Sequence, residues 1–174
     1  GRADFYAEHP QSALHTAYII CAMRGTGEAL KHKNEESIDL AAAYLGNGVV
    51  AADLAGAEAL FATENFSSLF AEAQRKNVPF TIHAGEAAGP ESIKAALQLG
   101  AQRIGHGVRS LEDTGVIQDL KAANVALEIC PTSNLQTHIF ESIERFPLEQ
   151  LLDAGLMVTI NTDNMTVSNT TLSH

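Results

Sequence analysis

Basic residues are scarce in this sequence, and they form no run. Lys and Arg together number 11 against 21 Asp and Glu, which gives a formal net charge of -10. Nucleic-acid backbones and anionic membranes both attract clustered positive charge. We therefore expect neither nucleic acid nor membrane among the partners of this protein.

Long apolar runs and paired cysteines are lacking too. The apolar stretches are far shorter than the roughly 20 residues that a membrane span needs, and residues 1–10 lack the apolar core of a signal peptide. Cys21 and Cys130 lie singly in apolar stretches, without the spacing of a zinc ribbon or a disulfide framework. These absences favour a cytoplasmic protein with two reduced thiols in its core.

What the chain does contain is a regular alternation of strand and helix patterns. Apolar runs typical of strands buried on both faces begin near residues 18, 48, 79, 102, 125 and 156. A helical pattern lies in every gap, for example over residues 35–45, 66–76 and 113–124. This alternation predicts a parallel sheet with right-handed crossovers.

Polar residues at the strand exits distinguish two parallel architectures. A doubly wound sheet places its site at one switch in strand order, whereas a (β/α)8 barrel carries functional residues at the ends of several strands. No GxGxxG follows the first strand, and polar residues follow five consecutive strands: Asp53, His83 with Glu86, His106, Asn134, and Asp163 with Asn164. We therefore predict an α/β fold, a partial (β/α)8 TIM barrel.

The length of the chain indicates how much of a barrel is present. A whole barrel takes roughly 250 residues, at roughly 30 residues per βα unit. We count six units, and we expect the first two strands to be missing, so residues 1–174 are interpreted as an incomplete barrel domain, the C-terminal part of a catalytic domain. Both ends are abrupt and resemble cuts through a longer chain. Open sheet edges usually pair with something, so self-association is a further expectation.

Three features indicate a metal-assisted hydrolytic site. His83 ends an apolar run, and Gly105 and Gly107 flank His106, which would let a ligand or a metal-bound water approach the imidazole. Asp163 follows a strand packed on both faces, where a carboxylate is costly unless it meets a cation or a proton. His and Asp are common ligands of Zn²⁺. The seven histidines include no His-x-His pair, so the ligand set is incomplete.

Four motifs, in order and with matching gaps, resemble the adenosine deaminase family. They are His-Ala-Gly-Glu at 83–86, Arg-Ile-Gly-His-Gly-Val at 103–108, Leu-Glu-Ile-Cys-Pro-Thr-Ser-Asn at 127–134 and Thr-Ile-Asn-Thr-Asp-Asn at 159–164. Residues 21–24 and 53–56 also resemble that family's third and fourth barrel strands. The resemblance runs from about Ala17 to Ser173. It implies a metal-dependent amidohydrolase barrel whose first-strand His-x-His lies outside this chain.

The resemblance implies a role for each of the predicted site residues. His83 and Asp163 would be ligands of one Zn²⁺, and Asp163 would also hold the water bound to it. Glu86 would donate a proton to purine N1, and His106 would orient or deprotonate the water.

Two further positions would contact the substrate. By the same resemblance, the backbone N–H of Gly56 would meet the purine ring. Asn164 stands where animal members commonly have Asp, and its amide would donate to N7 without needing a proton.

The implied function is zinc-dependent hydrolytic deamination of adenosine and 2'-deoxyadenosine to inosine and 2'-deoxyinosine with release of ammonia, in purine salvage. An adenine deaminase of the same superfamily is one alternative. An inactive fragment, or a purine- or metal-binding module, is another, because the first-strand ligands are absent. The cytidine-type zinc deaminases need a Pro-Cys-x-x-Cys motif, which this chain lacks.

Five other polar residues receive weaker assignments. Glu128 is interpreted either as a partner of the metal site or as a paired structural carboxylate. Ser133 and Asn134 are expected to be loop caps. His15 and His138 are expected to lie on the surface or on a helix face.

Overall fold

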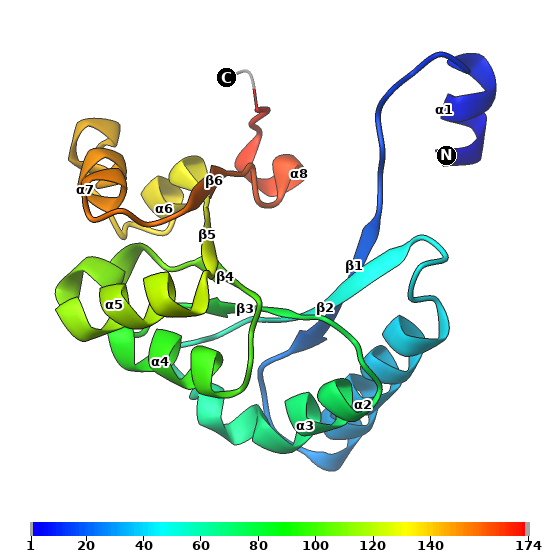
Figure 1. The fold of residues 1–174 in the computed structure, drawn as a ribbon, viewed down its shortest axis with the longest axis horizontal. Coiled ribbons are helices and arrows are strands. Elements are labelled where there is room, and N and C mark those ends of the chain that lie inside the picture. The colour runs from blue at the N-terminus through cyan, green and yellow to red at the C-terminus, as the bar shows by residue number, and fades with distance from the viewer. Residues whose placement is uncertain (1, 173–174) are drawn as a thin grey trace.

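Six short strands, each followed by a helix, form the frame of the chain (Figure 1). The structure is a computed structural model and describes residues 2–172, so Ser173, the last residue of the family resemblance, lies outside it. The strands are β1 (Tyr18–Met23), β2 (Val49–Ala55), β3 (Thr81–Ala84), β4 (Arg103–His106), β5 (Ala126–Ile129) and β6 (Val158–Ile160). All six strands lie where the apolar runs predict them. The expectation that every strand is buried on both faces is wrong for β1 and β6, which are largely exposed because each pairs with one strand among the described residues.

The helices occupy every gap between the strands. They are α1 (Arg2–Glu8), α2 (Glu28–Ala43), α3 (Ser67–Arg75), α4 (Pro90–Gln98), α5 (Thr114–Ala123), α6 (Pro131–Gln136), α7 (Leu148–Asp153) and α8 (Met165–Ser168). Three 3-10 turns, at Thr63–Phe66, Val108–Glu112 and Ile143–Arg145, complete the list. No helix within residues 2–172 is long and apolar enough to cross a membrane.

Helix boundaries follow local capping where capping residues exist. Asp113 accepts hydrogen bonds from the N–H groups of Gly115 and Val116, and Asn124 ends α5 in the left-handed conformation, as expected for a helix over 113–124. Helix α2 begins at Glu28 and not at the predicted residue 35. The sequence pattern misses its first two turns because they are mostly polar and lack an apolar periodicity. The sequence patterns do not predict helices α1, α6 and α8.

The strands pair in parallel and in chain order. β1 pairs with β2, and β3, β4, β5 and β6 form a four-stranded sheet. A bridge between Ala52 and Phe80 links the two groups, and the Ala52 N–H donates to the Pro79 carbonyl at 2.9 Å. The strands therefore follow one arc with helices α2 to α5 and α7 on its outer side (Figure 1). This arrangement is that of the predicted partial barrel.

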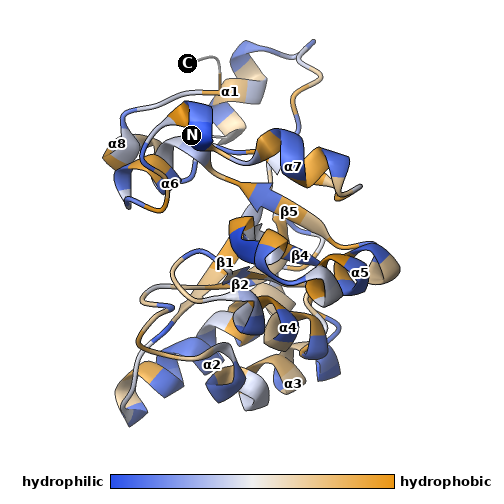
Figure 2. Cartoon of the chain, turned by 90° about the vertical axis from the view of Figure 1, so that its left-hand side faces the viewer, coloured by the Kyte–Doolittle hydropathy of each residue, from blue (hydrophilic) through white to orange (hydrophobic). Residues whose placement is uncertain are grey.

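The hydrophobic core lies between the sheet and the outer helices. One register row, Ile82, Ile104 and Leu127, faces this core and is fully buried. It packs within one apolar cluster that includes residues of the outer helices, among them Phe70 and Leu120. The strands are mainly hydrophobic, whereas the helices carry both hydrophilic and hydrophobic residues (Figure 2). Since strand side chains alternate in direction, the next register row faces the inside of the arc.

The expectation that both cysteines are core thiols is wrong for one of them. Cys130 is buried, but Cys21 is exposed, and neither forms a disulfide. Cys21 is next to Asp53 in the strand register, and its sulfur lies 3.7 Å from a carboxylate oxygen of that residue. Cys21 therefore belongs to the inner side of the arc, which an apolar run alone does not distinguish from the core.

Candidate active site

The inner face of the sheet brings together side chains from neighbouring strands. His83 is level with Gly105, and Gly105 is level with Glu128 on the next strand. These residues line a cleft of about 240 Å³ at the carboxyl ends of the strands. Other residues that line it include Asp53, His106, Cys130 and Asp163. Predicted residues from four strands or their exits therefore meet in one place.

The glycines beside His106 make room for protein atoms. A Cβ at Gly105 would lie 3.1 Å from Nδ1 of His83, and one at Gly107 would lie 2.6 Å from Cδ2 of Leu127. The expectation that these glycines make room for a ligand is therefore wrong. They allow close packing against the neighbouring strands instead. His106 has a φ of 62°, a conformation that costs a non-glycine residue about 1–3 kcal/mol and often occurs at functional sites.

Asp53 orients the His83 ring. Nδ1 of His83 lies 2.9 Å from one carboxylate oxygen of Asp53 and 3.1 Å from the other. Burial lowers the pKa of His83, but the hydrogen bond and the charge of Asp53 outweigh this effect, so the net pKa is raised. A carboxylate on one ring nitrogen leaves the other nitrogen for a ligand, an arrangement that is typical of metal-binding histidines. The sequence placed Asp53 at a strand exit without identifying this contact.

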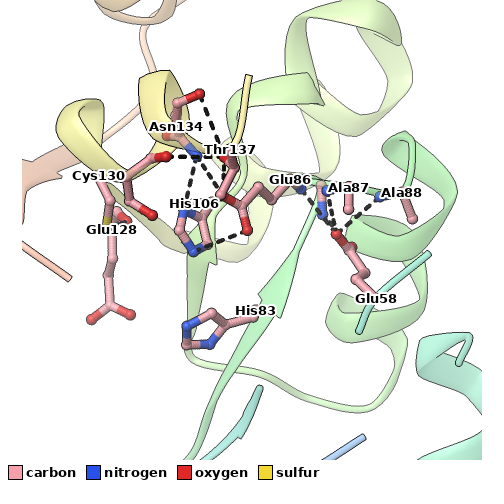
Figure 3. A network of polar contacts seen from close by, with 12 residues as sticks. Glu58, His83, Glu86, Ala87, Ala88, His106, Glu128, Cys130, Asn134 and Thr137 are labelled. Carbon is pink, nitrogen blue, oxygen red and sulfur yellow. Dashed lines mark hydrogen bonds and ion pairs between the residues drawn. The ribbon is translucent and has the colours of Figure 1, made fainter. Parts of the chain in front are cut away.

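Glu86 and His106 are joined through Asn134 (Figure 3). Nδ2 of Asn134 donates to Oε1 of Glu86 at 2.8 Å and lies 3.2 Å from Nδ1 of His106. Oε1 of Glu86 also accepts from the Thr137 hydroxyl at 3.2 Å. The other oxygen, Oε2, lies 3.5 Å from Nε2 of His106. Two donors therefore hold one oxygen of Glu86, and the other faces the imidazole.

Asn134 is a candidate site residue that the sequence patterns do not identify. It was expected to be a loop cap, but it lies in α6 and is fully buried. Ser133 is buried in the same helix. Pro131 occupies the first turn of α6, and proline is common at that position. Pro131 therefore indicates a helix at this position, and this helix places the side chain of Asn134 in the interior.

His106 is held as a neutral imidazole. It is 2% exposed. Burial lowers its pKa, and the neighbouring His83 lowers it further, while the charge of Glu86 opposes the shift. A neutral imidazole can accept a proton, as the predicted base must.

A metal could be held at the mouth of this cleft. Ligand atoms of His106, Cys130 and Asp163 all lie within 4.8 Å of one another. Burial raises the pKa of Cys130 to about 12, which keeps it a thiol, whereas metals bind the thiolate. His83 is not part of this trio, but its ring centre lies 5.1 Å from that of His106. The imidazoles and Asp163 thus offer donors suited to zinc.

The two predicted substrate contacts lie near the same edge of the sheet. Gly56 has a φ of 107°, and a Cβ there would lie 3.3 Å from the Arg24 backbone nitrogen, so a side chain would be strained and crowded. Asn164 accepts hydrogen bonds from the N–H groups of Thr166 and Val167 and thereby caps α8. This cap uses only the carbonyl oxygen of Asn164, so within residues 2–172 its amide nitrogen is left for another acceptor.

The weaker assignments are resolved by their contacts. Glu128 accepts from the Thr81 hydroxyl at 2.9 Å and pairs with Arg103 at 3.2 Å, which identifies it as a paired structural carboxylate. His15 and His138 are exposed, as expected. A larger cleft of about 760 Å³, lined by residues of α2 and α3, contains none of the predicted site residues.

Comparison with known proteins places these features in a family. A family model described as "Adenosine deaminase" matches residues 6–174. An adenosine deaminase of Haemophilus ducreyi is 51% identical over 155 residues, which cover 87% of this chain and 44% of that protein. The chain thus spans less than half the length of this curated relative.

Solved structures share the fold. An adenine deaminase from Arthrobacter aurescens is 29% identical with a TM-score of 0.80, covering 94% of this chain and 49% of that one. A zinc-bound amidohydrolase from Burkholderia ambifaria has a TM-score of 0.79 at 19% identity, covering 93% and 45%, which shows the fold alone. Matching motifs, a partial barrel and a family match over nearly the whole chain lead to one conclusion: the chain belongs to the adenosine deaminase family.

Proposed function

We propose that the protein carrying this chain hydrolyses the amino group of adenosine and 2'-deoxyadenosine, yielding inosine or 2'-deoxyinosine and ammonia, as a step of purine salvage. The observation that carries the proposal is the arrangement of Glu86 against His106, joined by Asn134 beside His83 and Asp163. An acid and a base side by side suit a reaction that moves protons to a ring nitrogen and from an attacking water at one carbon.

Glu86 and His106 would move the protons. When water adds to C6, one electron pair of the ring shifts to N1, which takes a proton from Oε2 of Glu86, while His106 accepts the proton that the water loses. The C6–N6 bond then breaks. The amino group takes the proton of His106 and leaves as ammonia, and the C6 hydroxyl returns a proton to Glu86.

His83 and Asp163 would hold one Zn²⁺, together with ligands outside this chain. The fit is supported by the Asp53 bond, which directs the free nitrogen of His83 away from Asp53, and by the closeness of Asp163 to His106. Bound zinc lowers the pKa of a water molecule to about 7 and so supplies a nucleophile at neutral pH.

Gly56 and Asn164 would bind the purine. The backbone N–H of Gly56 would meet the ring, where the absence of a side chain leaves space. The free amide nitrogen of Asn164 would donate to N7, because its oxygen is already used in capping α8.

Three further proposals concern features outside the candidate site. Residues 1–174 would be part of one hydrolase barrel domain, which the half-length match to relatives supports. A cytoplasmic location is supported by the two unpaired cysteines. In a protein made of residues 1–174 alone, self-association would use β1 and β6, each of which pairs with a single strand among the described residues.

The test uses purified protein with added zinc and follows the loss of adenine absorbance. Adenosine, 2'-deoxyadenosine and adenine are compared at equal concentration. We expect both nucleosides to be deaminated faster than the free base. Faster turnover of adenine would instead establish an adenine deaminase. No deamination of any of the three would refute the proposal.

A further inference from the structure

Glu58 is a buried acidic residue that no step of the proposed reaction uses. It lies in the turn after β2 and is 6% exposed. Its carboxylate points at the loop that leaves β3, the neighbouring strand (Figure 3). That loop carries Glu86.

Four successive backbone N–H groups donate to the Glu58 carboxylate. Gly85 donates to Oε1 at 2.6 Å. Glu86, Ala87 and Ala88 donate to Oε2 at 3.1, 2.8 and 3.0 Å. Successive N–H groups that converge in this way form a concave site for an anion, and here the anion is a side chain of the same protein.

The carboxyl group of Glu58 suits these four bonds better than an amide would. It has two acceptor oxygens and no donor, whereas a glutamine amide replaces one oxygen with a nitrogen that carries hydrogens. If glutamine keeps its oxygen on the three N–H groups at the Oε2 position, its nitrogen faces the N–H of Gly85. The glutamate side chain at residue 58 is therefore matched to this loop.

A second buried charge holds the start of the same loop. Arg24 is 5% exposed and donates to the His83 carbonyl at 2.6 Å. It also donates to the Phe61 carbonyl and to the Thr63 hydroxyl. Burial lowers the pKa of Arg24, and the charge of Glu58 opposes that shift, so the two groups interact. The backbone from His83 to Ala88 is thus held from both ends.

We propose that Glu58 is a positioning residue for the reaction: by binding the N–H groups of residues 85–88, it fixes the direction in which Glu86 presents its carboxyl group to the purine. The inference rests on the proposed function. The backbone of Glu86 is held by Glu58, and its side chain extends to Asn134 and His106 on the other side. Displacing a reacting group by about 1 Å can cost roughly 100-fold in rate.

The decisive experiment is a double-mutant cycle in the zinc-loaded protein that contains this chain. We expect Glu58→Gln to lower kcat about 10- to 100-fold with KM for adenosine and zinc content nearly unchanged. In a Glu86→Gln background the same change should have little further effect, because Glu58 acts through Glu86. An equal loss of kcat in the parent and in the Glu86→Gln background would overturn the proposal, since a purely structural role of Glu58 would lower kcat in both proteins.

Amide hydrogen exchange gives a second readout that does not depend on activity. Peptides covering residues 85–88 should exchange at least about tenfold faster in Glu58→Gln than in the parent, because lost hydrogen bonds expose these amides. Unchanged exchange would also overturn the proposal. Glu149→Gln, which removes an exposed carboxylate from the first turn of α7, is the matched control and should change neither readout. If the parent does not deaminate adenosine, the proposed function fails, while the exchange rates still decide whether Glu58 anchors the loop.

Discussion

Glu86→Gln replaces a carboxyl group with an amide of nearly the same shape. The amide oxygen can still accept from Asn134 and Thr137, whose donors lie 2.8 and 3.2 Å from Oε1. The amide nitrogen would take the place of Oε2, which lies 3.5 Å from Nε2 of His106. The substitution therefore preserves the two hydrogen bonds to the Oε1 position, exchanges the acceptor that faces His106 for a donor, and removes the proton that the purine N1 requires.

The expected loss follows from the value of one positioned acid. General acid catalysis contributes roughly 100- to 10,000-fold in rate, which corresponds to about 3 to 5 kcal/mol of activation free energy. Since Glu86 is only partly exposed and its oxygen Oε1 has two donors, we expect a loss toward the upper end of this range. Zinc content and thermal stability should change little, because no metal ligand or core contact is altered.

The assay measures kcat and KM for adenosine by absorbance at saturating zinc. Glu112→Gln serves as the control, because Glu112 is a surface carboxylate that pairs with Arg109 outside the cleft. It should retain parental activity. A Glu86→Gln protein with a kcat within about tenfold of the parent would remove Glu86 from the proton transfer.

Three other predictions concern the metal. His83→Ala should lose stoichiometric zinc, measured by atomic absorption after dialysis, and a protein that keeps it would contradict the ligand assignment. Asp53→Asn should weaken zinc binding about 10- to 100-fold in a competition titration, because the neutral amide keeps a single acceptor oxygen and its nitrogen cannot accept from His83; unchanged affinity would show that the contact does not orient the ring. A protein made only of residues 1–174 should bind zinc weakly and turn over little adenosine, since it has no His-x-His pair; a rate equal to that of an intact enzyme would refute this.

Local patterns were sufficient to predict the strands and most of the helices. A strand buried on both faces appears as an apolar run, and the run at 79–83 became β3. Asp113 and Asn124 marked both ends of α5 because their side chains and backbone conformations suit caps. The first turns of α2 were missed because nothing in a polar stretch indicates which residues will pack against the sheet.

The contacts between loops were beyond the reach of these patterns. Asp53 meets His83, 30 residues later, and Asn134 meets Glu86 across 48 residues. Glu58 meets four N–H groups that lie 27 to 30 residues further along the chain. A buried carboxylate that binds backbone groups leaves no motif, because its partners are not side chains.

The sequence by itself determined the order of strands and helices, because apolar periodicity is a local property of the chain. Its resemblance to a family predicted which side chains act as acid, base and metal ligands. The tertiary structure alone decided which partners hold those side chains: Asp53 on His83, Asn134 between Glu86 and His106, and Glu58 beneath the loop of Glu86. These contacts depend on parallel strands placing their carboxyl ends along one edge, so that distant loops come within hydrogen-bond distance only when the sheet has formed.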